Sequence, residues 1–298
     1  MKKLFFISLL LSYSFPASAE LNIFACEPEW AALSQELGGD DVVVYSATSG
    51  LQDPHYIQAR PSLIAKARKA DLLVCTGAEL EIGWLPLLQS KSANPMIQNG
   101  GDGYFMATDY VSLLNIPTHV DRSQGDVHSM GNPHIQTNPH HILKVAEALT
   151  LRLQQLDINK KNAYQQRWND FKQRWGSAIV KWEKQAEPLI NMPIVTQHDN
   201  WVYMIDWLHL NRVANMESKP GVPPTINDLN TVVNTLATSP AKAIIFAANQ
   251  PSKASDWLAD KTGVPTVSLP YTVGGHASTT NLFSLFDNTL MLLVKAQK

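Results

Sequence analysis

Four of the nine histidines lie in short loops that contain glycine, proline or asparagine. They are His55 in QDPHYI, His134 in GNPHIQ, His198 in TQHDNW and His276 in VGGHAS. Neutral imidazole is a ligand that suits zinc, and three or four nitrogen donors make a tetrahedral site without any redox role. Carboxylate-rich sites favour manganese or magnesium instead. If the fold brings these four side chains together, they predict a zinc site.

The segment Gly125–His141, GDVHSMGNPHIQTNPHH, offers more than one candidate ligand. Pro133 restricts the backbone just before His134, and a helix expected to begin near Pro139 anchors the chain soon after it. A side chain held at both ends loses less entropy when it binds. His128 lies in the run HSMG without a comparable anchor. We therefore expect His134, and not His128, to be the ligand from this segment, with His128 as a reserve ligand, a metal-entry site or a structural residue.

The elements that must position these loops alternate along the chain. Buried strands are expected at 21–26, 41–46 and 71–77, and again at 192–197, 241–248 and 264–271, with helical segments between them. This alternation predicts two α/β lobes, each a doubly wound parallel sheet. His55, His198 and His276 each follow a strand, and His134 precedes a helix. In open α/β sheets such loops border the ligand site, so a cleft between the lobes would collect all four histidines.

A long helix is expected between the two halves. Its apolar residues recur at spacings of three and four: Tyr164, Trp168, Phe171, Trp175, Ala178 and Trp182. Such a stripe is typical of a helix packed along both lobes as a rigid spine; a ligand platform of tryptophans is the alternative. The predicted organisation is a signal peptide at 1–19, an N-terminal metal-binding lobe at 20–159, a linking helix at 160–189 and a C-terminal metal-binding lobe at 190–298.

The first residues indicate export. Lys2 and Lys3 precede a short apolar run, and the ASA triplet that ends at Ala19 is a signal-peptidase site. Removing both lysines from the 24 basic residues leaves 22 against 26 acidic ones, a balance that gives no reason to expect nucleic acid as a partner. In an oxidising compartment Cys26 and Cys75 could form one disulfide or remain as two buried thiols.

Several segments together resemble the metal-specific solute-binding proteins of ABC uptake systems, in the zinc and manganese class. They are FACEPEW, DPHY, CTGAELEIGWL, GDVHSMGNPHIQTNP, KPGVPPT and LPYTVGG. The resemblance implies a periplasmic, non-enzymatic monomer that binds a divalent metal between two lobes and delivers it to the permease of an ABC transporter. It also implies that His55, His134 and His198 are ligands, with His198 favouring zinc as the transported ion.

The fourth ligand departs from the family pattern. The family usually supplies an acidic residue from a C-terminal loop, but this chain has none between Asp260 and Asp287. We therefore expect His276, or a water molecule, at that position. Two other functions stay open: a secreted zinc hydrolase, although no HExxH-type motif is present, and a metal-dependent adhesin or metal chaperone that uses the same site.

Overall fold

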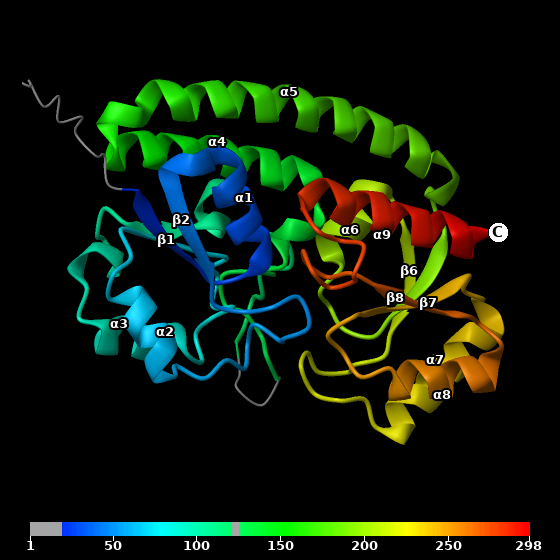
Figure 1. The fold of residues 1–298 in the computed structure, drawn as a ribbon. Helices are drawn as coiled ribbons and strands as arrows, with labels where there is room; N and C mark the ends of the chain where they lie inside the picture. Colours follow the sequence, from blue (N-terminus) through cyan, green and yellow to red (C-terminus); the bar gives the residue numbers. More distant parts are fainter. Residues whose placement is uncertain (1–19, 121–124) are drawn as a thin grey trace, which may run out of the picture.

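Two parallel four-stranded sheets form the cores of two lobes that lie side by side (Figure 1). The computed structural model describes residues 20–120 and 125–298, so the expected signal peptide at 1–19 lies outside the described residues. The N-terminal sheet has the order β2-β1-β3-β4: β1 (Leu21–Ala25), β2 (Val42–Ser46), β3 (Leu72–Cys75) and β4 (Tyr104–Met106). The C-terminal sheet has the order β6-β5-β7-β8: β5 (Pro193–Thr196), β6 (Asn211–Asn215), β7 (Ala243–Ala247) and β8 (Thr266–Leu269). The predicted pair of parallel α/β lobes is confirmed.

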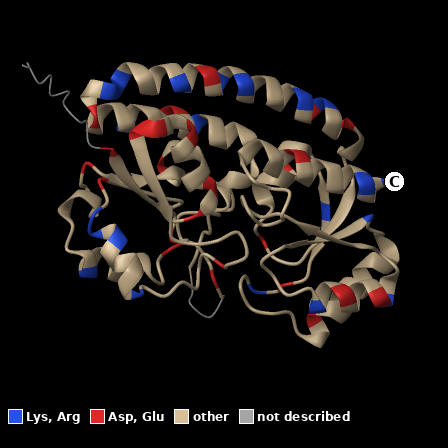
Figure 2. Cartoon of the chain, viewed as in Figure 1, with Lys and Arg blue, Asp and Glu red and all other residues tan. Residues whose placement is uncertain are grey.

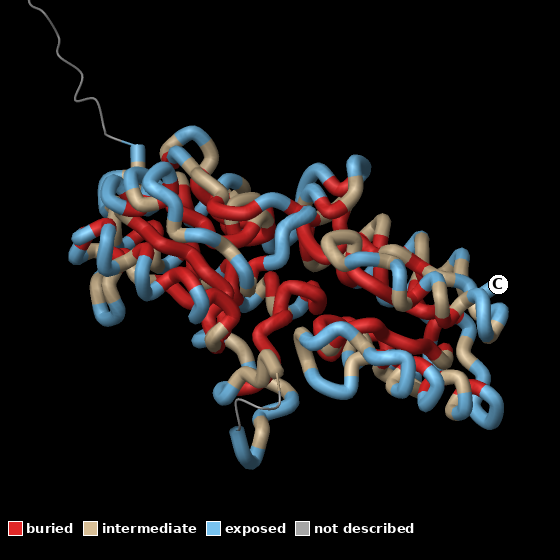
Figure 3. The backbone as a smooth tube through the Cα atoms, turned by 90° about the horizontal axis from the view of Figure 1, so that it is seen from below, coloured by how far each residue is buried: buried red, intermediate tan, exposed pale blue. Residues whose placement is uncertain are grey.

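Helices cover both sheets. Those of the N-terminal lobe are α1 (Pro28–Gly38), α2 (Pro61–Ala67), α3 (Leu85–Ser92) and α4 (Pro139–Leu156). Those of the C-terminal lobe are α6 (Val202–Leu208), α7 (Ile226–Thr238), α8 (Lys253–Thr262) and α9 (Leu282–Gln297). Buried stretches of backbone run through the interior of both lobes (Figure 3). The central strands β3 and β7 are buried at every residue, whereas the edge strands β2 and β6 are mostly half-buried. Among the described residues, no helix is both long and apolar enough to span a membrane.

Helix α5 (Lys161–Ala186) runs along the top of both lobes and continues into a single 3-10 turn, Glu187–Leu189 (Figure 1). It packs against α1 and α4 of the first lobe and against α9 of the second. The predicted stripe is its buried face, except that Ile179 is buried where Ala178 was expected. Charged residues of both signs are interspersed along the helix (Figure 2). The interpretation of this segment as a spine, rather than a ligand platform, is confirmed.

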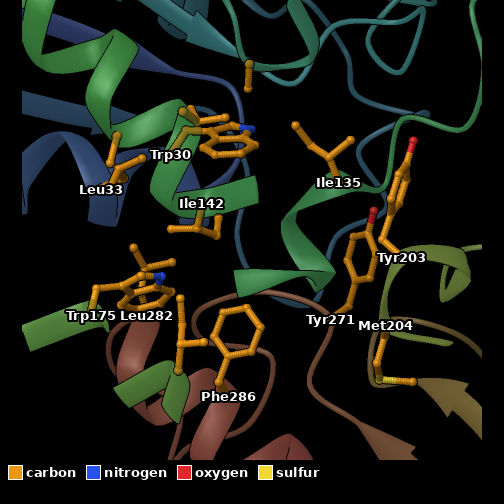
Figure 4. Close-up of a cluster of buried hydrophobic side chains, with 14 of the residues drawn as sticks. Trp30, Leu33, Ile135, Ile142, Trp175, Tyr203, Met204, Tyr271, Leu282 and Phe286 are labelled. Carbon is orange, nitrogen blue, oxygen red and sulfur yellow. The ribbon is translucent and has the colours of Figure 1, made fainter. Parts of the chain in front are cut away.

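An aromatic cluster joins the lobes beneath this helix (Figure 4). Trp30 of α1, Trp175 of α5 and Phe286 of α9 belong to the same buried core. The rings of Trp175 and Phe286 meet edge to face, with centroids 5.5 Å apart. Such pairs add a specific geometry to the burial of a large apolar area. The lobes therefore share one continuous hydrophobic core on the side away from their strand ends.

Cys26 and Cys75 form a disulfide that links the ends of the neighbouring strands β1 and β3. Their Cα atoms are 4.8 Å apart, within the usual range for a bridge. Both residues are fully buried. Of the two states that the sequence left open, the structure has the disulfide.

Three buried glutamates surround the ends of these strands. Glu27 Oε2 accepts hydrogen bonds from the backbone N–H and the hydroxyl of Thr76, at 3.3 and 3.1 Å. Glu81 Oε1 accepts from the same N–H at 2.7 Å. Glu29 accepts from the hydroxyl of Thr272 in the other lobe. Burial raises the pKa of all three carboxyl groups, that of Glu29 from 4.5 to about 7.

We expect these glutamates to make the free energy of unfolding depend on pH. Because their pKa values are higher in the folded state, the folded state binds protons more tightly, and stability is lost as pH rises from about 4.5 through about 7. Replacing Glu29 by Gln keeps an acceptor for Thr272 but removes the titration. The Tm of Glu29→Gln should therefore rise relative to the parent protein between about pH 5 and about pH 8, by a few degrees. Glu147→Gln, at an exposed position of α4, is the matched control; a pH-independent difference for Glu29→Gln would contradict this prediction.

Candidate metal site

The rings of four histidines from both lobes converge. His55, His128 and His134 come from the N-terminal lobe and His198 from the C-terminal lobe. The Nε2 atoms of His55 and His128 are 3.3 Å apart. The ring centroid of His134 is 5.8 Å from that of His55, 6.1 Å from that of His128 and 5.7 Å from that of His198. One ring nitrogen from each of His55, His128 and His134 lies within 4.8 Å of the others.

The loop after β2 presents His55. The Oδ1 atom of Asp53 accepts from the backbone N–H of His55 at 3.0 Å and lies 2.8 Å from its Nδ1. A carboxylate at Nδ1 fixes the tautomer that leaves Nε2 free as a ligand and makes the ring more basic toward a metal. The second nitrogen of His55 is thereby directed at His128.

His134 is the most enclosed of the four, with 2% of its surface exposed. Asn132 Oδ1 accepts from its backbone N–H at 3.0 Å, and a 3-10 turn (Ile135–Thr137) leads from it into α4. The hydroxyl of Tyr271, just after β8, lies 2.7 Å from His134 Nδ1. Burial, followed by the nearby histidines, lowers the pKa of His134 well below its ordinary value. The ring is therefore neutral, the form that binds a metal.

His198 follows β5 and is oriented by Glu217. The Nδ1 of His198 lies 2.6 Å from Glu217 Oε2, which also accepts from the backbone N–H of Gly221 at 2.8 Å. Burial alone would favour the neutral ring, but the hydrogen bond and the charge of Glu217 outweigh it and raise the pKa of His198. His198 is thus held by a carboxylate partner on one nitrogen, as His55 is.

His128 is anchored, contrary to the expectation from the sequence. Its neighbour Ser129 donates a backbone hydrogen bond to Glu79 Oε2 at 2.7 Å, and Asp126 donates one to the carbonyl of Pro220 in the other lobe at 2.8 Å. Burial, followed by the charge of His55, lowers the pKa of His128 to about 4. The structure therefore brings His128 and His134 to the site together.

His276 lies apart from this cluster, which differs from the expectation that it would join the other three. Its Nε2 is 3.4 Å from the hydroxyl of Ser268. The backbone holds it in a turn in which its carbonyl accepts from Thr279 N at 3.0 Å. Tyr271 comes sooner after β8 and reaches the cluster instead. The reason is the position of each residue after the end of β8. Tyr271 follows the strand closely, whereas the chain turns before it reaches His276.

The arrangement is suited to holding a metal with nitrogen donors. A tetrahedral zinc ion with bonds of 2.0–2.1 Å keeps its ligand atoms roughly 3.3 Å apart, which is the spacing of the Nε2 atoms of His55 and His128. Two carboxylates beside the cluster, those of Asp53 and Glu217, are hydrogen-bonded to His55 and His198. Sequence reasoning missed the roles of Tyr271 and Glu217 as partners of ligands, although the KPGVPPT and LPYTVGG segments mark their surroundings.

The sequence is similar to those of metal-binding proteins of uptake systems. Residues 23–296 match the family model described as zinc-uptake complex component A, periplasmic. A metal ABC transporter substrate-binding lipoprotein of Streptococcus mutans is 21% identical over 258 residues, covering 86% of this chain and 82% of the relative. A manganese ABC transporter substrate-binding lipoprotein of Streptococcus pneumoniae is 23% identical over about half of each chain.

Solved structures share the fold. A crystal structure of ZnuA superimposes with a TM-score of 0.78 at 18% identity, covering 94% of this chain and all of that one. A manganese-bound periplasmic metal-binding protein from Candidatus Liberibacter asiaticus gives a TM-score of 0.76 at 15% identity, with the same coverage.

Proposed function

The chain belongs to the family of periplasmic zinc-uptake component A proteins, a family of metal-specific substrate-binding components of ABC transporters, and from this premise we propose that its cargo is zinc. The protein captures the ion between its lobes and delivers it to the permease of the uptake system. It acts as a monomer in the periplasm, after cleavage of the signal peptide at 1–19. It catalyses no reaction, since the site only binds and releases its cargo.

The observation that carries the proposal is the donor set: four imidazoles and no carboxylate within the described cluster. His55, His128 and His134 form the compact part of the site, and His198 approaches from the other lobe as the fourth ligand. Imidazole-rich sites suit zinc, whereas manganese prefers carboxylate, carbonyl and water oxygens. His276 is not a ligand in this proposal, because its ring lies against Ser268.

Metal analysis of the purified mature protein tests the proposal. After removal of all metal and dialysis against equal concentrations of zinc and manganese, the protein should retain about one zinc per chain and little manganese, because zinc stands above manganese in the general order of affinities and nitrogen donors widen that difference. Zinc should displace bound manganese in a competition titration, and manganese should not displace zinc. Equal retention of the two ions would contradict the choice of zinc and leave only the broader function in metal uptake.

We expect Glu217→Gln to weaken zinc binding by about 10- to 100-fold, the usual effect of losing a partner that orients a metal ligand. The substitution keeps the size of the side chain and one acceptor oxygen for Gly221, but it removes the negative charge that stabilises and orients His198. A zinc titration in competition with a chelator of known affinity measures the change. Glu183→Gln is the matched control, because Glu183 also bonds a histidine, His140, but on the exposed surface away from the site. Equal effects of the two substitutions would show that Glu217 does not act through His198.

A further inference from the structure

A cavity of about 640 Å³ adjoins the histidines and extends into the C-terminal lobe. His134, His198 and Tyr271 line the end nearest the cluster. A water molecule occupies roughly 30 Å³, so the space far exceeds what one metal ion and its waters need. It falls instead within the range of pockets that bind small organic molecules, about 300–1,000 Å³.

The cavity lies where an α/β sheet offers a ligand site. The chain order of the C-terminal sheet reverses between β5 and β7. Residues that follow these two strands line the cavity: Gln197, His198 and Asn200 after β5, and Asn249–Pro251 after β7. Ligands of such sheets bind in the crevice at this point. At the corresponding point of the N-terminal sheet, between β1 and β3, the disulfide and the buried Glu27 and Glu81 fill the space. The two lobes are therefore unequal.

The polar groups of the cavity match a small zwitterion. Lys253, the first residue of α8, is the single permanent cation among the described lining residues, and it stands at a helix N-terminus, which also favours an anion. Asn200 is 3% exposed, and its Oδ1 has no hydrogen-bond partner among the described residues; the same holds for Asn249 Oδ1. Both side chains line the cavity, where a small rotation of the amide would bring this oxygen to an N–H group of a ligand. Leu229 and Trp257 supply an apolar wall.

We propose that the protein binds its metal together with a small amino-acid chelator, of which L-histidine is the representative. This inference rests on the proposed metal-binding function. The carboxylate of the chelator pairs with Lys253, its N–H groups bond Asn200 and Asn249, and its side chain packs on Trp257. A nitrogen of its imidazole faces the histidine cluster and binds the zinc as an additional ligand, which needs the expansion from four to five ligands that zinc sites can undergo.

Equilibrium dialysis with radiolabelled L-histidine tests the inference. The metal-free mature protein is dialysed against the labelled amino acid with and without zinc chloride, and both zinc and label are counted. We expect about one histidine retained per bound zinc, and little retained without the metal, because the metal supplies the donor bond that completes the complex. A parallel dialysis with labelled L-alanine, which lacks the imidazole, should retain much less.

Substitutions in the cavity separate this inference from the proposed function. Lys253→Ala and Trp257→Ala should each lower the affinity for L-histidine about tenfold or more, as expected from the loss of a charge-assisted hydrogen bond or of buried aromatic contact, while zinc binding in the absence of L-histidine stays near that of the parent protein. Lys242→Ala, at the exposed position before β7, is the matched control. If the parent protein retains zinc but no labelled L-histidine when both are present, the chelator inference alone is overturned, whereas a protein that retains no zinc under either condition would overturn the proposed function.

Discussion

Zinc affinity should fall by more than about 100-fold when His134 is replaced by alanine, beyond the upper end of the effects seen for partners outside the coordination sphere. The ring centroid of His134 lies 5.7–6.1 Å from those of His55, His128 and His198. It is neutral because burial lowers its pKa, and its backbone is held before binding by Asn132. Because His134 is already ordered in the metal-free protein, its binding to zinc costs little conformational entropy, and its loss removes a strong ligand. Competition titration with a chelator of known zinc affinity measures the change.

Two comparisons keep this test specific to the metal. His140→Ala removes a histidine six residues away that bonds Glu183 on the surface, and zinc affinity should stay unchanged. His134→Gln preserves a polar side chain opposite Tyr271, so that a loss of affinity in a variant with an unchanged Tm reports the lost ligand rather than lost folding. If His134→Gln and His134→Ala both bind zinc as the parent protein does, His134 is not a ligand.

The second large effect distinguishes His128 from His276. We expect His128→Ala to weaken zinc binding by about 100-fold or more and His276→Ala by less than about tenfold, the low end of effects outside the coordination sphere. The reason is distance: the Nε2 atoms of His128 and His55 are 3.3 Å apart, whereas the ring of His276 lies against Ser268. The same zinc titration, carried out on both variants side by side, measures the difference.

The opposite order of effects would restore the expectation from sequence alone, in which His276 completes the site and His128 does not. Similar small effects would mean that water, rather than either histidine, occupies the remaining position. The double variant His128→Ala/His276→Ala distinguishes these cases. If both residues bind the same metal ion, their effects on the free energy of zinc binding do not add; if they act independently, the effects add.

The general architecture was predictable because its signals are local. The apolar stripe from Tyr164 to Trp182 fixes the buried face of α5 through helical periodicity alone. Alternating strands and helices predict parallel sheets, and parallel sheets place loops such as those of His55 and His198 at one edge. Strand β4, with three residues, and helix α7 were not among the expected elements. Three residues are too few to show a period, although Thr225 and Asp228 form a capping box at the start of α7.

The sequence by itself therefore determined which loops could supply ligands. It also determined that these ligands share the chemistry of imidazole. Which histidines meet was decided by the tertiary structure. His128 reaches His55 across 73 positions of sequence because Glu79 and Pro220 hold its loop. Tyr271 rather than His276 faces the cluster because the chain turns after β8. Contacts of this kind depend on how distant segments pack together, so they cannot be predicted from the periodicity or spacing of residues within one segment.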